Sequence, residues 1–352
     1  MSTPYQRRIA CALATAVTLT VTAGCGAGDD HADRPAAAHS TPQTPAPATA
    51  PKGAVTRDEA KELLSRYVAV NNRANAMQGR STSPSEQARK LLATVEGGQL
   101  LEQSTADYKL WRTKTAKEKE EYADPFYYIK PVVYAPAGER WFAIEVTVDP
   151  TGWKGLVVFD QVHGTGWRNV ATVALGGKKS SRLPAPIATD RAGWATAVNA
   201  TTRTGRLAPN QVADAFEDLF ASGGTGAGQA LARTPSTEHA LKVYKERNKN
   251  NGSRAATKSF KQTNARHQKI YALKLRDGST LAVVPSAHEQ FYELKKEFIL
   301  RAKLIPTKEE AVFNPAKRIA VIDEFQGLLL AHLPVSGKPR VLSHDFRMVD
   351  SQ

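Results

Sequence analysis

The sequence predicts an α+β protein made of two tandem halves, each with N-terminal helices followed by a curved antiparallel β-sheet. Helix signals open residues 56–97 and again 207–222, where a capping residue or a proline precedes apolar residues at helical spacing. Runs with period-two alternation follow each helical region. The turns between these runs are too short for parallel crossovers, so each sheet is expected to be antiparallel.

Composition narrows the class of protein further. The chain has 352 residues, a net charge of +14, 41% hydrophobic residues and two cysteines, Cys11 and Cys25. These values are typical of a soluble globular protein and exclude collagen-like, wholly disordered and polytopic membrane classes. Two cysteines make at most one bridge, which excludes a disulfide-stapled scaffold.

Residues 1–24 are expected to be a signal peptide. Arg7 and Arg8 form a positive n-region, and an apolar stretch from Ile9 to Ala23 follows. This stretch is shorter than the roughly 20 residues that a spanning helix needs, and it fits a secretory h-region.

The signal ends in Thr22-Ala23-Gly24-Cys25, which resembles the lipobox of bacterial lipoproteins. The resemblance implies cleavage between Gly24 and Cys25 and a diacylglycerol on the sulfur of Cys25, with fatty acids such as palmitate. It places the mature protein on the extracytoplasmic face of the cell membrane. Thr22 stands where the lipobox usually has leucine, and the alternative is an ordinary cleaved signal that ends near a cysteine.

Residues 25–55 are expected to be a lipidated cysteine and a disordered Pro/Ala/Thr-rich tether. The segment 26–55 lacks aromatic residues and has few large apolar ones, so it buries too little surface to offset its ordering entropy. His31 and His39 then lie at solvated positions. Once Cys11 has left with the signal, an acylated Cys25 leaves no thiol for a disulfide or a metal.

The first α+β half is expected at residues 56–177. Thr56 and Glu59 form a capping box ahead of a helix, and Ser85-Glu86 opens a second helix that runs to Val95. After Asp124-Pro125, four strands are expected at 126–134, 140–148, 154–162 and 167–175.

A polar connector is expected at 178–206, and the second α+β half at 207–352. A helix follows Pro209 and ends at Gly223-Gly224. Residues 290–304 are ambiguous between helix and strand, and the shared parity of their apolar positions favours strand. The remaining expected elements are a short helix from 307 to 310 and strands at 268–275, 279–285, 317–333 and 338–349.

In each half, helices come first and a curved sheet follows. This order of elements resembles that of the NTF2-like or cystatin-like fold, which would then occur twice in tandem over residues 56–350. The arrangement of lipobox, tether and two α+β halves also resembles actinobacterial secreted lipoproteins of unassigned function. That likeness implies no catalytic residues.

No catalytic motif with a defined mechanism is present. The Gly223–Gly228 run follows a helix, whereas phosphate-cradling loops follow a strand, so it is interpreted as a connector. The histidines are scattered singly, which predicts neither a metal site nor a cofactor. Five tryptophans lie in the first half, as core residues or as the lining of a ligand groove: Trp111, Trp141, Trp153, Trp167 and Trp194.

An NTF2-like cone can house acid–base residues, and four polar residues near the expected strands are candidates for that role. The alternative is that each faces solvent on a half-exposed sheet. The four are Glu145, Asp160, His288 and His344.

Basic charge is concentrated in one segment. Without residues 1–24 the chain keeps a net charge of +12, and the stretch from His239 to Lys269 carries +8 of it. Anionic lipid headgroups, wall polymers or envelope proteins are candidate partners, and nucleic acid is not expected for an exported protein. The alternative is a solvated charge run in a loop. The candidate residues are Lys242, Lys245, Arg247, Lys249, Arg254, Lys258 and Lys261.

These observations favour a lipid-anchored envelope protein with a non-enzymatic binding or interaction role. The alternative is an enzyme with an acid–base site in an NTF2-like pocket. A solute-binding component of a transporter is disfavoured, because strand–helix alternation around a parallel sheet is not seen.

Overall fold

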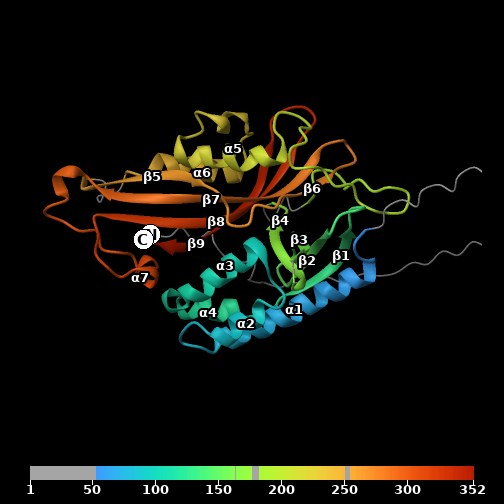
Figure 1. Cartoon of the computed structure of the whole chain (residues 1–352), viewed down its shortest axis with the longest axis horizontal. Helices are drawn as coiled ribbons and strands as arrows, with labels where there is room; N and C mark the ends of the chain where they lie inside the picture. The colour runs from blue at the N-terminus through green and yellow to red at the C-terminus, as the bar shows by residue number, and fades with distance from the viewer. Residues whose placement is uncertain (1–52, 163, 177–181, 250–253) are drawn as a thin grey trace, which may run out of the picture.

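A computed structural model describes residues 53–162, 164–176, 182–249 and 254–352. The expected signal peptide, Gly24, Cys25 and nearly all of the expected tether lie outside these residues. The described chain is arranged in layers, with α5 and α6 on one side, two β-sheets in the middle and α1 to α4 on the other side (Figure 1). The structure is thus α+β with antiparallel sheets, as predicted.

The helices that precede the first sheet begin at local sequence signals. Thr56 and Glu59 form the predicted capping box, and Thr115 and Glu118 form a second one that the sequence analysis did not use. The second predicted helix ends at Leu92 rather than Val95, and a further helix starts at Gly98, where a helix stop was expected. The helices are α1 (Arg57–Gly79), α2 (Glu86–Leu92), α3 (Gly98–Lys109) and α4 (Ala116–Ala123).

The first sheet is a four-stranded antiparallel meander in the order β1-β2-β3-β4, which confirms the four predicted strands within two residues. One face packs on α1, and the other faces the second sheet. The strands are β1 (Tyr127–Tyr134), β2 (Trp141–Asp149), β3 (Trp153–Val162) and β4 (Gly166–Ala174).

The second sheet has the order β5-β7-β8-β9, with β6 paired to the other end of β7. The predicted strand over 290–304 is wrong beyond Leu294, where β7 ends and a 3-10 turn begins at Lys296. Strand β5 lies in the basic stretch that had been interpreted as a loop. The strands are β5 (Ala256–Thr263), β6 (Tyr271–Lys274), β7 (Thr280–Leu294), β8 (Ala320–Leu333) and β9 (Arg340–Ser351).

Helices α5 (Val212–Ala221) and α6 (Pro235–Glu246) cover the outer face of the second sheet. The apolar face of α5, with Phe216 and Phe220, packs on β7, β8 and β9, so the helix predicted after Pro209 is confirmed. A short helix, α7 (Glu310–Phe313), begins where Thr307 and Glu310 exchange capping hydrogen bonds.

The inner faces of the two sheets share one hydrophobic core. Trp141, Leu156 and Val158 of the first sheet belong to the same cluster as Leu281 and Leu328 of the second. The expected polar connector takes part as well, because Ile187 and Ala195 are buried in this cluster. Folded structure also begins earlier than expected, since Gly53 bridges to Ala137 and Val55 is buried against α1.

The tryptophans lie in different layers and therefore line no common groove. Trp111 is buried beside α4, and Trp141 lies between the sheets. Trp167 and Trp194 pack on the opposite face of the first sheet. Among the described helices, none combines the length and the hydropathy needed to cross a membrane.

Candidate functional site

A buried cluster of titratable side chains lies between α5 and the second sheet. Strand alternation points Ser286 and His288 of β7 toward α5, where Glu217 faces them. The Ser286 hydroxyl donates to Glu217 Oε1 at 2.5 Å. Nδ1 of His288 lies 2.9 Å from Glu217 Oε2, outside the alignment of a hydrogen bond. We refer to these three residues as the Glu217 cluster.

Aromatic rings pack around the imidazole of His288. The centroids of Phe346, Phe220 and Phe325 lie 4.9, 5.0 and 5.1 Å from that of His288. Only 5% of His288 is exposed. The position of Phe346 depends on Gly327, because a Cβ there would lie 2.3 Å from the ring carbon Cδ1. The imidazole is therefore part of a packed core and is closed to a substrate in this conformation.

A second histidine pair lies next to the Glu217 cluster. Nδ1 of His239 on α6 is 3.1 Å from Nε2 of His344 on β9. Burial, together with the nearby His239 and His288, lowers the pKa of His344 to about 4. Burial, assisted by Lys242, also lowers the pKa of His239. Both rings are therefore neutral at pH 7, and one donates its N–H to the other.

This arrangement does not match that of nucleophilic catalysis. Activation of a serine requires a histidine between the hydroxyl and the carboxylate, whereas Glu217 itself lies between Ser286 and His288. In the part of the chain that the structure describes, no group of three His, Cys, Asp or Glu side chains is arranged to hold a metal ion. The Glu217 cluster instead fixes α5 on the sheet through polar contacts.

The structure brings two of the four acid–base candidates, His288 and His344, close together, and the other two lie elsewhere. None of the four is a plainly solvent-facing residue. His288 and His344 lie on the outer face of the second sheet. Asp160 lies between the sheets, where its Oδ2 accepts from Tyr271 at 2.8 Å and from Lys269 at 2.7 Å. Glu145 accepts from Tyr134 and Lys154, each at 3.3 Å.

The tyrosines beside these two carboxylates are stabilised in their protonated form. Burial, with a contribution from Glu145, raises the pKa of Tyr134 to about 12. Burial and Asp160 raise the pKa of Tyr271. The two carboxylates therefore act as acceptors in separate structural contacts rather than as members of one acid–base site.

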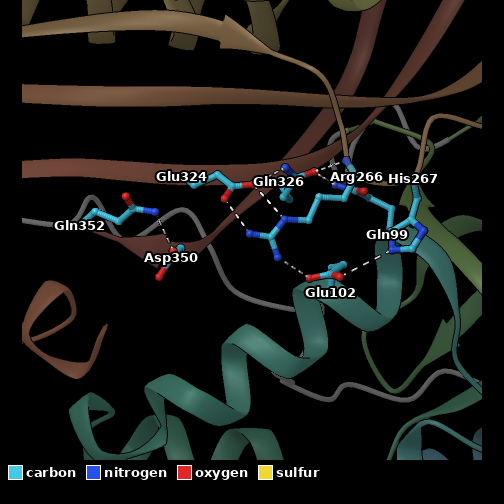
Figure 2. A network of polar contacts seen from close by, with 8 residues as sticks. All are labelled: Gln99, Glu102, Arg266, His267, Glu324, Gln326, Asp350 and Gln352. Atoms are coloured by element: carbon cyan, nitrogen blue, oxygen red, sulfur yellow. Dashed lines mark hydrogen bonds and ion pairs between the residues drawn. The ribbon is translucent and has the colours of Figure 1, made fainter. Parts of the chain in front are cut away.

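A polar network joins α3 to the second sheet (Figure 2). The guanidinium of Arg266 donates to both carboxylate oxygens of Glu324, at 2.9 and 2.6 Å, and to Glu102 at 3.2 Å. Gln326 accepts from Gln99 of α3 at 3.0 Å and from the backbone N–H of Arg266 at 3.1 Å. The network therefore ties α3 to β8 of the second sheet.

Further along α3, a buried ion pair makes the same connection. Arg347 of β9 donates to the two oxygens of Asp107 at 3.2 and 3.3 Å, and Gln103 donates to the backbone carbonyl of Asp345 at 3.0 Å. The helix thus packs on the second sheet through polar side chains spaced three or four residues apart.

The seven basic candidates lie on α6, on β5 and between these two elements. Five are exposed, and within the described residues none of the five is in an ion pair. The other two are engaged in the fold. Arg247 stacks on Tyr244 at 3.6 Å, and Lys258 donates to Gln290 at 3.2 Å, with a pKa lowered by burial. We call the exposed five the α6–β5 basic surface: Lys242, Lys245, Lys249, Arg254 and Lys261.

Together, the fold and the candidate site describe an α+β protein with two antiparallel sheets, a closed polar core cluster and an exposed basic surface. Residues 51–352 match the model of a protein family described as a domain of unknown function, DUF8094, and the chain belongs to this family. It is 34% identical over 292 residues to an uncharacterized lipoprotein of Streptomyces coelicolor, in a match covering 79% of this chain and 75% of that protein. No solved structure matches the chain.

Sequence reasoning missed Glu217 and His239. Glu217 precedes Phe220 by three residues and so borders the apolar face of α5, which was a usable signal. His239 lies on α6, a helix that was not expected, although Thr234 and Pro235 mark its start.

Proposed function

We propose that the protein is a lipid-anchored envelope protein of the extracytoplasmic face, with a non-enzymatic binding role in which the α6–β5 basic surface contacts anionic groups. The anchor is the diacylglycerol on Cys25 after cleavage behind Gly24. The lipobox-like Thr22–Cys25 segment supports it, as does the name of the Streptomyces relative, a lipoprotein. Two acyl chains hold a protein at a membrane stably, whereas one holds it only marginally.

The observation that carries the binding role is the set of five exposed cations of the α6–β5 basic surface. Each basic side chain near an anionic surface contributes about 1 kcal/mol to binding, within a Debye length. The closed packing around His288 favours this role over that of an enzyme.

The proposal includes two tandem NTF2-like or cystatin-like halves, residues 56–177 and 207–352, joined by 178–206. Each sheet has helices on its outer face and presents its inner face to the other sheet, which supports this division.

Two experiments test the proposal. Mass spectrometry of the membrane-bound protein is expected to find a diacylglycerol-modified Cys25 as the first residue, and Cys25→Ser is expected to release the protein into the medium. An unmodified thiol would contradict the anchor.

The binding role is tested with the mature chain from residue 25 carrying Cys25→Ser. Lys242, Lys245 and Lys249 are changed together to Glu, and binding to inorganic polyphosphate and to phosphatidylglycerol vesicles is measured. We expect a loss of about tenfold or more. A control variant has the same charge change at exposed positions on α1, α2 and α4, namely Arg73, Lys90 and Lys117, and is expected to bind as the unsubstituted chain does. Equal binding by both variants would contradict the role of the surface.

A further inference from the structure

The segment between β7 and β8 forms a projecting tip at one end of the long strands (Figure 1). Leu304 and Arg318 pair as an isolated antiparallel bridge, with N···O distances of 2.7 and 3.2 Å, so the two ends of the segment run side by side. Leu304 is buried with Leu294 and Val321, and Phe298 and Ile299 pack against them. The tip, residues 295–319, is therefore held in place by its own small core.

Other apolar side chains of the tip point away from this core. Leu300 is 96% exposed, Ile305 is 73% exposed and Ile319 is 42% exposed. A single exposed aliphatic residue is ordinary, but three on one short projection, two of them mostly in water, need an explanation. The small core is filled by other side chains of the tip, so Leu300 and Ile305 contribute little to its packing.

Basic side chains are interspersed along the tip with the exposed aliphatic ones. Five cations of the tip are exposed, and within the described residues none of them is in an ion pair. Of the three acidic side chains of the tip, Glu297 is exposed, and Glu309 and Glu310 are half-buried. The five exposed cations of the tip are Lys296, Arg301, Lys303, Lys308 and Lys317.

The tip adjoins the α6–β5 basic surface. The backbone N–H of Lys295 donates to the carbonyl of Ala255 at 2.8 Å, and Ala256 belongs to the same small core as Leu294. Arg254 is next to this contact in the chain. Arg254 of the α6–β5 basic surface therefore lies at the same end of the molecule as the cations of the tip.

The geometry points to a membrane-contact site, in which Leu300 and Ile305 enter the headgroup–acyl boundary of an anionic bilayer while the surrounding cations contact its headgroups. This inference rests on the proposed function and identifies lipid as the binding partner. A wall polymer supplies charge but no apolar phase for the two aliphatic side chains. An anionic bilayer offers both an apolar boundary layer for isolated aliphatic side chains and negatively charged headgroups for the cations beside them.

The proposed anchor is compatible with this contact. Residues 25–52 span at most about 95 Å when fully extended. The described chain begins at the opposite end of the molecule from the tip (Figure 1). Contact through the tip, together with the acylated Cys25, would then hold the long axis of the molecule along the membrane.

The test uses the mature chain from residue 25 with Cys25→Ser, so that the acyl anchor does not mask weaker binding. Leu300→Ser/Ile305→Ser is compared with Val335→Ser, which changes an aliphatic side chain that is 56% exposed in the turn between β8 and β9. Binding to phosphatidylglycerol-containing vesicles is expected to fall about tenfold or more in the double variant and to stay within about twofold in the control. Binding to soluble polyphosphate is expected to stay unchanged in both.

A second measurement reports insertion directly. The mature Cys25→Ser chain contains no cysteine, so Leu300→Cys carries the single thiol for an environment-sensitive dye. A blue shift with anionic vesicles at position 300, and none for Val335→Cys, supports the inference. Vesicle binding by the double variant equal to that of the unsubstituted chain overturns it, as does the absence of any vesicle binding. Failure of the α6–β5 variant to lose polyphosphate binding instead overturns the proposed function.

Discussion

His239 and His344 face each other across the interface between α6 and β9, with Nδ1 of one ring 3.1 Å from Nε2 of the other. The pair is neutral because burial lowers the pKa of each histidine, and the pKa of His344 falls to about 4. Phe216 and Phe346 enclose His344, with ring centroids at 5.3 and 6.2 Å. A helix that sequence reasoning missed is thereby joined to the last strand of the chain.

Acid is expected to weaken the fold through this pair. The folded-state pKa of His344 lies below the value of about 6.5 for an unfolded chain, so the unfolded state takes up the proton first. The stability that the neutral ring contributes is fully present above pH 6.5 and is lost as pH falls from there toward 4. The loss is on the order of 3 kcal/mol.

The measurement is urea denaturation of the mature Cys25→Ser chain and of the same chain with His344→Gln, between pH 7.5 and pH 4. Asp323 acts in the opposite direction over part of this range, since burial raises its pKa to about 6. The difference between the two proteins isolates His344. We expect the difference to shrink steadily as the pH falls below 6.5, and a constant difference would contradict the assignment.

Removal of the Glu217 carboxylate is expected to be costly. Glu217→Ala leaves both Ser286 and His288 buried without their shared partner, and each buried polar group left without a partner costs about 1–3 kcal/mol. Ser286→Ala removes one hydrogen bond and is expected to cost about 1–3 kcal/mol. Urea midpoints of the two variants check the order. A smaller loss for Glu217→Ala than for Ser286→Ala would show that the carboxylate does not hold the cluster together.

Gly327 is expected to tolerate no side chain while Phe346 is present. A Cβ at position 327 would overlap the ring, and overpacking of this kind costs about 1–3 kcal/mol. The double variant Gly327→Ala/Phe346→Ala removes the clash, so its loss is expected to be smaller than the sum of the two single losses. Additive losses in the double-mutant cycle would exclude a direct clash.

The two arginines that connect α3 to the second sheet are expected to differ in strength. The side chain of Arg266 is 42% exposed and that of Arg347 is 8% exposed. Arg266→Ala should cost about 1 kcal/mol or less, with a smaller effect at high salt. Arg347→Ala removes a charged partner from the buried carboxylate of Asp107 and should cost about 3 kcal/mol with little salt dependence. Thermal unfolding at low and high salt measures the loss of stability in each of the two variants. Equal losses that both shrink at high salt would contradict the expectation drawn from the difference in burial.

Local signals were sufficient for much of the fold. The capping box at Thr56, the alternation in β2 and the glycine turns each involve residues close together in the chain, and the elements they predicted are present. Other local signals were present but not used. Thr115 and Glu118 mark α4, and Thr234-Pro235 marks α6.

The sequence by itself determined the α+β class, the antiparallel meander and the concentration of basic charge. Only the tertiary structure decided that the two sheets share a core, that His239 meets His344 across 105 positions of sequence, and that Leu300 points into water while Leu304 does not. The physical reason is that periodicity records which residues share a face of one element. Which other element covers that face depends on contacts between distant segments, and these form only when the whole chain packs.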